Sequence, residues 1–281
     1  MQMRTNMLLT RKKIELSLLS FFVIALLTAC GDSKEKTEED QNQEKSEVTM
    51  QQSNTENEVN QLSQKEKEEG WELLFDGQST EGWRGYNKDS FPSQGWVVED
   101  GALKVQGSGA GEAGNGGDII YDEEFKDFEL SLEWKVSEGG NSGIFYLAEE
   151  VEGEPIYTSA PEMQILDNER HPDARLGKDG NRQAGSLYDL IPADPQNAKP
   201  AGEWNKASIL VYRGTVVHNQ NGENVLEYHL WTDQWEEMVK DSKFKDWERF
   251  LNAGGEDRKG YIGLQDHGDD VWFRNIKIKR L

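Results

Sequence analysis

The sequence is nearly devoid of cysteine, because Cys30 is the single one among 281 residues. One thiol cannot form a disulfide within the chain, so any folded domain must be stabilised by its hydrophobic core and its hydrogen bonds. Long apolar runs are missing too. The mostly apolar stretch at residues 16–27 is too short to span a membrane comfortably.

Positive charge is also scarce. The chain has 53 acidic against 31 basic residues and a net charge of −22, and residues 70–281 alone hold 40 acids and 22 bases. A surface of this sign repels phosphate backbones, which argues against nucleic acid as a partner.

The N-terminus has the parts of an export signal. A basic start, with Arg4 and Arg11, precedes the apolar stretch at 16–27. The stretch ends in Leu27-Thr28-Ala29-Cys30, which resembles the bacterial lipobox, where cleavage precedes a cysteine that is then lipidated. We therefore predict a signal peptide over 1–29 and lipidation of Cys30. The mature protein is expected outside the cytoplasm, as a membrane-anchored lipoprotein of the periplasm or the cell surface.

Residues 31–69 lack aromatic residues altogether and have few aliphatic ones. With 12 acids and 5 bases, this segment cannot bury enough apolar surface to offset chain entropy. We predict a disordered acidic tether over 30–69, with a short helix possible near its end, and one folded domain over 70–281.

The domain contains all nine tryptophans, and its hydrophobic period is mostly two. Alternation over Phe128–Val136 predicts a strand with a core face and a polar face, and Trp134 lies in phase with the core. Ala207–Leu230 is interpreted as a hairpin, with strands over 208–217 and 225–230 around Asn221-Gly222, a favoured turn pair. Two more strands are expected at 261–264 and 271–278.

Helical periodicity is confined to about Trp235–Phe250. Many short strands separated by glycine-rich turns favour an all-β fold. We predict an antiparallel β-sandwich of the concanavalin A-like jelly-roll kind.

Two polar strand faces are candidate sites. Glu133 and Lys135 lie on the polar face of the strand at 128–136, and Glu162 and Gln164 share a face of the stretch 162–167. We predict that both strands line one groove. The competing interpretation is that polar sheet faces are simply solvated.

Histidine offers weaker signals. His171 and His267 follow carboxylate-rich segments, whereas His218 and His229 lie in the predicted hairpin and are expected to have packing roles. Neither an HExxH motif nor a compact set of metal ligands is present, so no metal ligands are assigned.

Several ordered stretches together resemble the 3-keto-disaccharide hydrolase family, also described as 3-keto-glucoside lyase/hydratase. The stretches that carry the resemblance are Leu74-Phe75-Asp76-Gly77, Gly82-Trp83, Glu133-Trp134-Lys135, Gly140-Asn141-Ser142-Gly143-Ile144, Gln164-Ile165-Leu166-Asp167, Ala184-Gly185-Ser186-Leu187-Tyr188-Asp189, Gly202-Glu203-Trp204-Asn205, Gly263-Leu264-Gln265-Asp266-His267-Gly268 and Trp272-Phe273-Arg274-Asn275-Ile276. They cover nearly all of residues 71–281.

The resemblance implies a jelly-roll enzyme that acts on sugars oxidised to a ketone at carbon 3. The ketone acidifies the proton on carbon 2, so a base can remove it and the glycosidic oxygen leaves carbon 1. Water can then add to the enone. An oxidoreductase that supplies the ketone is the implied partner.

Such a reaction needs a base, a group that stabilises the enolate and an acid. The predicted base is Glu162, with Glu133 second. Lys135 or Gln164 would polarise the keto oxygen, with a divalent cation as the alternative. His171 or His267 would protonate the leaving group. The motif residues expected to bind substrate are Lys135, Gln164, Asn141, Tyr188 and Gln265.

Two other functions stay open at this stage. A conventional jelly-roll glycosidase carries a Glu-x-Asp-x-Glu-like triplet on one strand face, and its two catalytic carboxylates stand about 5–10 Å apart. Glu129 and Glu133 have the spacing of the triplet's outer residues, but Ser131 stands where the middle carboxylate would be, which counts against this function. A non-catalytic carbohydrate-binding lipoprotein is the second alternative, because a fold alone does not define an activity.

Overall fold

The computed structural model describes residues 59–109 and 114–281. The predicted signal peptide, Cys30 and most of the predicted tether lie outside the described residues. No helix within these two ranges combines the length and the apolar character that crossing a membrane requires.

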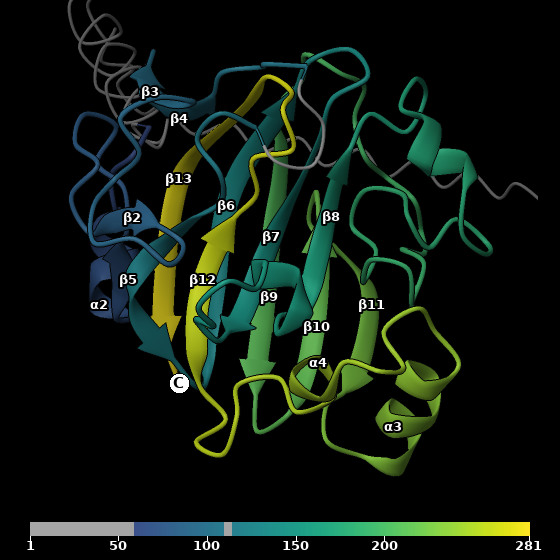
Figure 1. Ribbon diagram of the computed structural model, residues 1–281. Helices are drawn as coiled ribbons and strands as arrows, with labels where there is room; N and C mark the ends of the chain where they lie inside the picture. Colours follow the sequence, from purple (N-terminus) through teal and green to yellow (C-terminus); the bar gives the residue numbers. More distant parts are fainter. Residues whose placement is uncertain (1–58, 110–113) are drawn as a thin grey trace, which may run out of the picture. The chain divides into compact units, whose positions relative to one another are not determined.

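Two antiparallel sheets face each other across a common core (Figure 1). Sheet A has eight strands: β1 (Trp71–Leu73), β3 (Trp96–Glu99), β4 (Ala102–Val105), β6 (Phe128–Val136), β9 (Asn205–Tyr212), β10 (Thr215–Gln220), β11 (Glu223–His229) and β13 (Val271–Arg280). Sheet B has five: β2 (Trp83–Gly85), β5 (Ile119–Phe125), β7 (Asn141–Ala148), β8 (Glu162–Leu166) and β12 (Gly260–Leu264).

The order of strands is β11-β10-β9-β6-β13-β4-β3 in sheet A, where β1 also pairs with β13, and β2-β5-β12-β7-β8 in sheet B. Consecutive strands such as β6 and β7 alternate between the sheets. The predicted all-β antiparallel sandwich of the jelly-roll kind is confirmed.

The core explains why β6 and β8 have polar outer faces. Leu132 and Trp134 of β6 are at most 1% exposed and share one hydrophobic cluster with Met163 and Ile165 of β8. Burial of each such side chain stabilises the fold by about 1.5–3 kcal/mol. Since β6 and β8 lie in different sheets and both turn their apolar residues inward, their polar residues point to opposite outer surfaces. The prediction that these two strands line one groove is wrong.

The predicted hairpin over 207–230 is a three-stranded unit. The turn at Asn221-Gly222 joins β10 to β11 as predicted. A second turn at Arg213-Gly214 joins β9 to β10, and both of its residues have positive φ, 51° and 86°. Because arginine seldom adopts positive φ, the division of the run 208–217 at this turn was not predicted.

The predicted helix over 235–250 is interrupted. It consists of α3 (Asp233–Lys240) and α4 (Glu248–Leu251) with a turn between them. Ser242 accounts for part of the interruption, because its hydroxyl donates to the carbonyl of Val239 at 2.7 Å and accepts the N–H of Phe244 at 3.0 Å.

The folded unit begins upstream of the predicted boundary at Gly70. The helix α2 (Gln64–Glu68) starts with a capping box formed by Ser63 and Glu66. Before it, Asn60 is only 6% exposed and exchanges backbone-to-side-chain hydrogen bonds with Asn275 of β13. Residues 59–69 therefore belong to the fold and not to the tether.

Candidate active site

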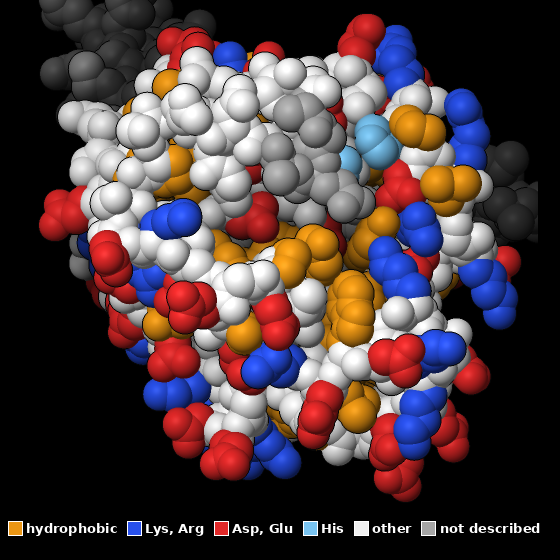
Figure 2. Space-filling view, in the orientation of Figure 1, with side chains coloured by type: hydrophobic (Ala, Val, Ile, Leu, Met, Phe, Trp, Pro, Cys, Tyr) orange, Lys and Arg blue, Asp and Glu red, His pale blue; other side chains and the backbone are white. Residues whose placement is uncertain are grey.

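A pocket opens on the outer face of sheet B. Its volume is about 260 Å³, and Figure 2 shows apolar side chains gathered in the middle of this face, over β7 and β8. The lining residues come from strands, from the loops after them and from the connection between β11 and β12: Asn141, Tyr157, Ala160, Glu162, Gln164, Tyr188, Lys243, Phe244, Trp247, Phe250, Gln265 and His267.

The pocket brings together most of the residues predicted from the sequence. Its polar side chains include Glu162 and Gln164 from β8, Asn141 from β7 and Gln265 after β12. Tyr188 and His267 line it as well. These six residues lie up to 126 positions apart in the chain. Their roles in binding or catalysis stay predictions, but their shared location is a fact of the fold.

Glu162 is placed by a glycine on the neighbouring strand. It is 7% exposed, and its backbone pairs with Phe145 of β7 and accepts the N–H of Tyr188 at 3.0 Å. A Cβ atom at Gly143 would lie 2.1 Å from Glu162 Oε1. The carboxylate therefore occupies the space that a side chain at 143 would need.

The amide side chains are oriented by the backbone. Gln164 Oε1 accepts the N–H of Ile165 at 3.1 Å, which leaves its NH₂ group as the end that can donate to a ligand. Asn141 is 4% exposed, and its Oδ1 has no hydrogen-bond partner among the described residues. A buried side-chain oxygen without a hydrogen-bond partner is rare in folded proteins.

Aromatic rings and one lysine form the opposite wall. The Trp247 ring lies 5.7 Å from that of Tyr157 and 5.2 Å from that of Phe244, measured between centroids. Lys243 Nζ stands 4.1 Å from the centroid of Tyr188. Burial lowers the pKa of Lys243, although Asp189 acts against this. Apolar ring faces of this kind bind the apolar faces of sugars.

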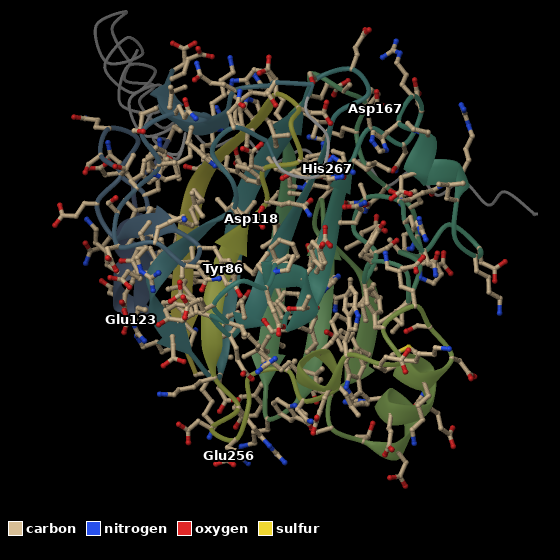
Figure 3. The ribbon with its side chains drawn as sticks, viewed as in Figure 1. Tyr86, Asp118, Glu123, Asp167, Glu256 and His267 are labelled. Carbon is tan, nitrogen blue, oxygen red and sulfur yellow. The ribbon has the colours of Figure 1, made fainter. Side chains whose placement is uncertain are left out.

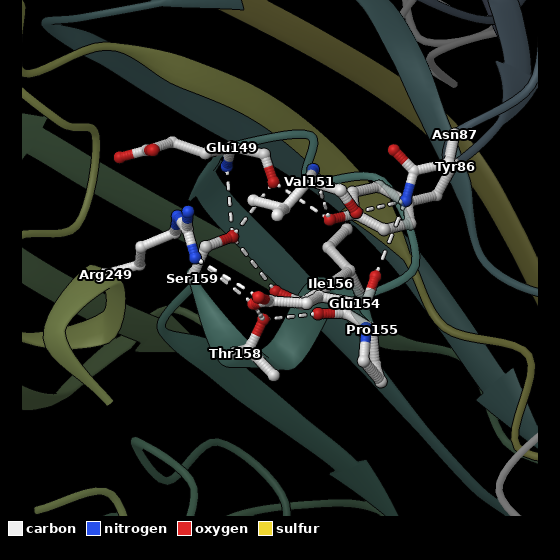
Figure 4. A network of polar contacts seen from close by, with 10 residues as sticks. All are labelled: Tyr86, Asn87, Glu149, Val151, Glu154, Pro155, Ile156, Thr158, Ser159 and Arg249. Atoms are coloured by element: carbon white, nitrogen blue, oxygen red, sulfur yellow. Dashed lines mark hydrogen bonds and ion pairs between the residues drawn. The ribbon is translucent and has the colours of Figure 1, made fainter. Parts of the chain in front are cut away.

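A network of polar contacts holds this wall in place (Figure 4). Arg249 of α4 pairs with Glu154 at 3.3 Å, and Glu154 precedes the 3₁₀ turn η1 (Ile156–Thr158) that carries Tyr157. On the other side, Tyr86 donates to the carbonyl of Glu149 at 3.0 Å. The loop between β7 and β8 is thus tied both to α4 and to the loop after β2.

Tyr188 is fixed by charged neighbours. Its hydroxyl donates to Asp173 Oδ2 at 2.9 Å, and Arg182 bridges Asp173 at 2.8 Å and Asp189 at 2.5 Å. Burial, followed by the charge of Asp173, raises the pKa of Tyr188. The phenol is therefore held neutral over the pocket, with Lys243 against its ring.

His171 and His267 lie close together although 96 positions separate them. Their ring centroids are 6.1 Å apart, and each offers a ligand atom within 4.8 Å of the other and of a carboxylate oxygen of Asp269. These three half-buried side chains have the types and positions to hold a metal ion. Burial lowers the pKa of His171, and His267 adds to this effect.

The histidine end of the pocket is the end away from α4, as the position of His267 in Figure 3 shows. Beside it, Asp266 accepts the N–H groups of Gly116 and Gly117 at 2.9 and 3.1 Å. The N–H of Asp266 in turn donates to Asp118 Oδ1 at 3.0 Å. Burial raises the pKa of Asp118 to about 7, and the charge of Asp266 contributes.

Glu133 and Lys135 do not belong to this pocket. Both lie on the outer face of sheet A, where Glu133 pairs with Arg274 at 2.7 Å. Lys135 Nζ stands between two rings, 4.9 Å from Trp204 and 4.4 Å from Trp272. Their assignment to the same site as Glu162 is corrected: they form a surface cluster on the other side of the sandwich.

Sequence reasoning missed Lys243 and the aromatic residues around it. The signal was present, because Phe244, Trp247 and Phe250 follow Lys243 within seven positions. The predicted helix over about 235–250 includes these positions and assigns only Trp247 among them to its apolar face. The interruption after α3 is what turns part of this stretch toward the pocket.

These features define a β-sandwich protein with a half-enclosed pocket that combines a buried carboxylate, side-chain amides, a lysine and aromatic rings. The 3-keto-alpha-glucoside-1,2-lyase-like domain model matches residues 70–279. The chain belongs to this family.

Individual relatives agree with this assignment. The chain is 53% identical to a 3-keto-disaccharide hydrolase of Bacteroides thetaiotaomicron, over 96% of this chain and 99% of that protein. Two crystal structures from Parabacteroides distasonis, provisionally described as glycosyl hydrolases, are 28% and 26% identical. They cover 80% and 75% of this chain and 100% and 99% of their own, with TM-scores of 0.69 and 0.58.

Proposed function

We propose that this protein cleaves 3-keto-glycosides by β-elimination, and that water then adds to the product to give net hydrolysis. One observation carries the proposal for this chain: a buried carboxylate, donor amides and a cation from separate family motifs and segments meet in one aromatic-walled pocket. The family and the hydrolase relative support the same substrate class.

The reaction begins with proton removal. With the sugar in the pocket, the Glu162 carboxylate takes the proton from carbon 2, and the electron pair of that bond moves onto the keto oxygen as an enolate. The enolate then returns its electrons, a double bond forms between carbons 1 and 2, and the glycosidic oxygen leaves carbon 1. The Gln164 NH₂ is a candidate donor to the developing oxyanion.

Lys243 is the candidate acid for the departing oxygen. It lies on the aromatic side of the pocket, where a leaving group would rest against Trp247. Its lowered pKa brings an ammonium group closer to the operating range of a general acid. His267 lies toward the other end, so the prediction that a histidine protonates the leaving group is replaced here by one that uses Lys243.

The direct test is turnover of a 3-keto-glucoside, followed by the ultraviolet absorbance of the enone. We expect Glu162→Gln to lower kcat by about 10²–10⁴-fold, because the amide keeps the shape of the base but cannot accept the proton. Lys243→Met should lower kcat most for substrates with poor leaving groups.

Glu133→Gln is the matched control, since Glu133 is a carboxylate of the same type on the opposite face of the sandwich. It should keep its activity. Full turnover by Glu162→Gln would remove Glu162 as the base. Tight binding of the 3-keto sugar without any enone or hydrolysis product would instead support the carbohydrate-binding alternative.

We also propose that the domain works outside the cytoplasm, anchored through a lipid on Cys30. The lipobox-like stretch at 27–30 supports this. Labelling of cells with a fatty acid should mark the wild-type chain and leave Cys30→Ala unmarked; equal labelling would contradict it. The ketone of the substrate must come from an oxidation of the sugar at carbon 3, so an oxidoreductase is the expected partner.

A further inference from the structure

A group of three potential metal ligands stands at the histidine end of the pocket. His171 follows β8, and His267 and Asp269 follow β12, so two loops from neighbouring parts of sheet B contribute. One ligand atom of each residue lies within 4.8 Å of the others. All three side chains are half-buried, and His267 lines the pocket.

The chemistry of the three ligands selects among metals. Imidazole nitrogens suit zinc and other divalent transition metals, whereas calcium and magnesium prefer a full set of oxygen ligands. Bonds from such metals to nitrogen and oxygen are about 2.0–2.2 Å long, so the three atoms can reach one ion after small side-chain rotations. Two histidines and one carboxylate also leave coordination positions open for a substrate oxygen.

Asn141 provides an independent observation. Its buried Oδ1 has no hydrogen-bond partner among the described residues, and its side chain lines the same pocket as His267. A buried oxygen of this kind indicates a ligand, water or ion that satisfies it. The N–H of Asn141 donates to Asp269 Oδ2 at 3.1 Å, which orients the carboxylate as outer partners orient metal ligands.

The local charge favours a cation as well. Asp167 and Asp173 lie close enough to influence His171, together with Asp269. Two of these carboxylates have a cationic partner, since Arg170 lies 3.9 Å from Asp167 and Arg182 pairs with Asp173 at 2.8 Å. The histidine pair thus lies in a net negative environment.

We propose that His171, His267 and Asp269 bind a divalent transition-metal ion, and that this ion polarises the keto oxygen of the substrate. The second clause rests on the proposed function, whereas the first does not. When Glu162 takes the proton from carbon 2, the electron pair left behind moves to the keto oxygen, and the ion stabilises that negative charge. The ion stays bound, and its charge is the same before and after the leaving group departs.

Metal binding has a consequence at the start of the 3₁₀ turn η2 (Pro172–Arg175). There, His171 Nδ1 accepts the N–H of Asp173 at 3.2 Å. An ion on Nδ1 takes the same lone pair, and an ion on Nε2 requires the ring proton to sit on Nδ1. Either way the hydrogen bond ends, so the amide resonance of Asp173 should shift when metal is added.

The test uses the chain without a histidine tag, stripped with EDTA and titrated with Zn²⁺, Mn²⁺ or Co²⁺ by calorimetry. We expect one ion per chain, and for Co²⁺ the absorption bands of nitrogen and oxygen coordination. His267→Ala and the milder Asp269→Asn should each weaken binding by about 100-fold or more. His229→Ala, at an exposed histidine of β11, is the control and should bind normally.

Two results would overturn the proposal. The first is a stripped wild-type chain that gives no isotherm with any of the three ions, or unchanged affinity in a folded His267→Ala variant. The second is equal enone formation by the stripped and loaded chains, which would deny the ion its role at the keto oxygen. If the loaded chain binds metal but never turns over a 3-keto-glucoside, the proposed function fails, while the isotherm still identifies the metal site.

Discussion

Gly143→Ala tests the placement of the proposed base, Glu162, without replacing that residue. The methyl carbon would stand 2.1 Å from Glu162 Oε1, whereas ordinary contacts begin near 3.4 Å. Glu162 Cδ and Cγ would lie only 2.7 and 2.8 Å from the added carbon as well. The whole Glu162 side chain must therefore shift, which moves the carboxylate by about 1 Å or more. The backbone φ of Gly143 is not positive, so alanine can adopt the same backbone conformation.

The size of the effect follows from that displacement. A misplacement of about 1 Å at a reacting group lowers the rate by about 10²-fold, which corresponds to about 2.7 kcal/mol of activation free energy. Folding stability should fall by about 3 kcal/mol at most. Crowding beside a buried side chain costs about 1–3 kcal/mol, and the restriction that alanine puts on the unfolded chain offsets about 0.4–1 kcal/mol of it.

The assay is enone formation from a 3-keto-glucoside, with urea unfolding measured in parallel. Gly263→Ala is the matched control, because Gly263 lies on β12 of the same sheet and its added methyl would meet Ile156 Cδ1, at 2.7 Å, instead of Glu162. We expect the loss of kcat in Gly143→Ala alone. Wild-type kcat in a folded Gly143→Ala protein would refute the inference that the carboxylate position is critical.

Three further outcomes are expected. Trp247→Ala should raise KM for 3-keto-disaccharides about 10-fold and change kcat less, because a stacking surface is lost; an unchanged KM would contradict a sugar-binding wall. Tyr146→Phe should lower the unfolding free energy by about 1–3 kcal/mol, since the buried hydroxyl bonds to His218 at 2.8 Å and to Tyr228 at 2.6 Å; an unchanged urea midpoint would count against it. Asp118 has a raised pKa in the folded state, so it contributes a falling slope to stability as pH rises from about 4 to about 7, whereas buried His218, whose pKa is lowered to about 4, contributes a rising one. Asp118→Asn should remove the falling slope and be the more stable protein at pH 8, which urea midpoints at pH 5 and 8 will check.

Strands were predicted where apolar and polar residues alternate over a long segment, whereas β4 and β5 were not predicted although part of each is buried. The segment Phe128–Val136 alternates strictly, and the strand has these bounds in the structure. The predictions of element bounds were wrong where a single backbone conformation or hydrogen bond, and not a hydrophobic period, determines where an element ends. Arg213 takes a left-handed conformation that no local pattern announces, and the hydroxyl of Ser242 is bonded within the turn that follows α3.

The site was predictable in part for the same reason. The family motifs identified Glu162 and Gln164 as candidates, and the prediction that they share one location is confirmed, because both line the same pocket. The motifs also identified Glu133, which lies on the other sheet. A single sequence does not show which of two sheets a polar strand face belongs to. His171 and His267 became a possible ligand pair only through the meeting of two loops, since their separation in the chain has no metal-binding spacing.

The connection between β11 and β12 carries Lys243, Phe244 and Trp247, whereas Glu162 and Gln164 lie on β8, the edge strand of sheet B. The two halves of the chemistry are therefore encoded in separable stretches of sequence. If Lys243 is the acid and Glu162 the base, as proposed, exchanging the connection would change the acid and the wall that contacts the aglycone together, while the strand that carries the base stays as it is. Such a division would allow related enzymes to differ in the glycosides that they accept through changes in one surface segment.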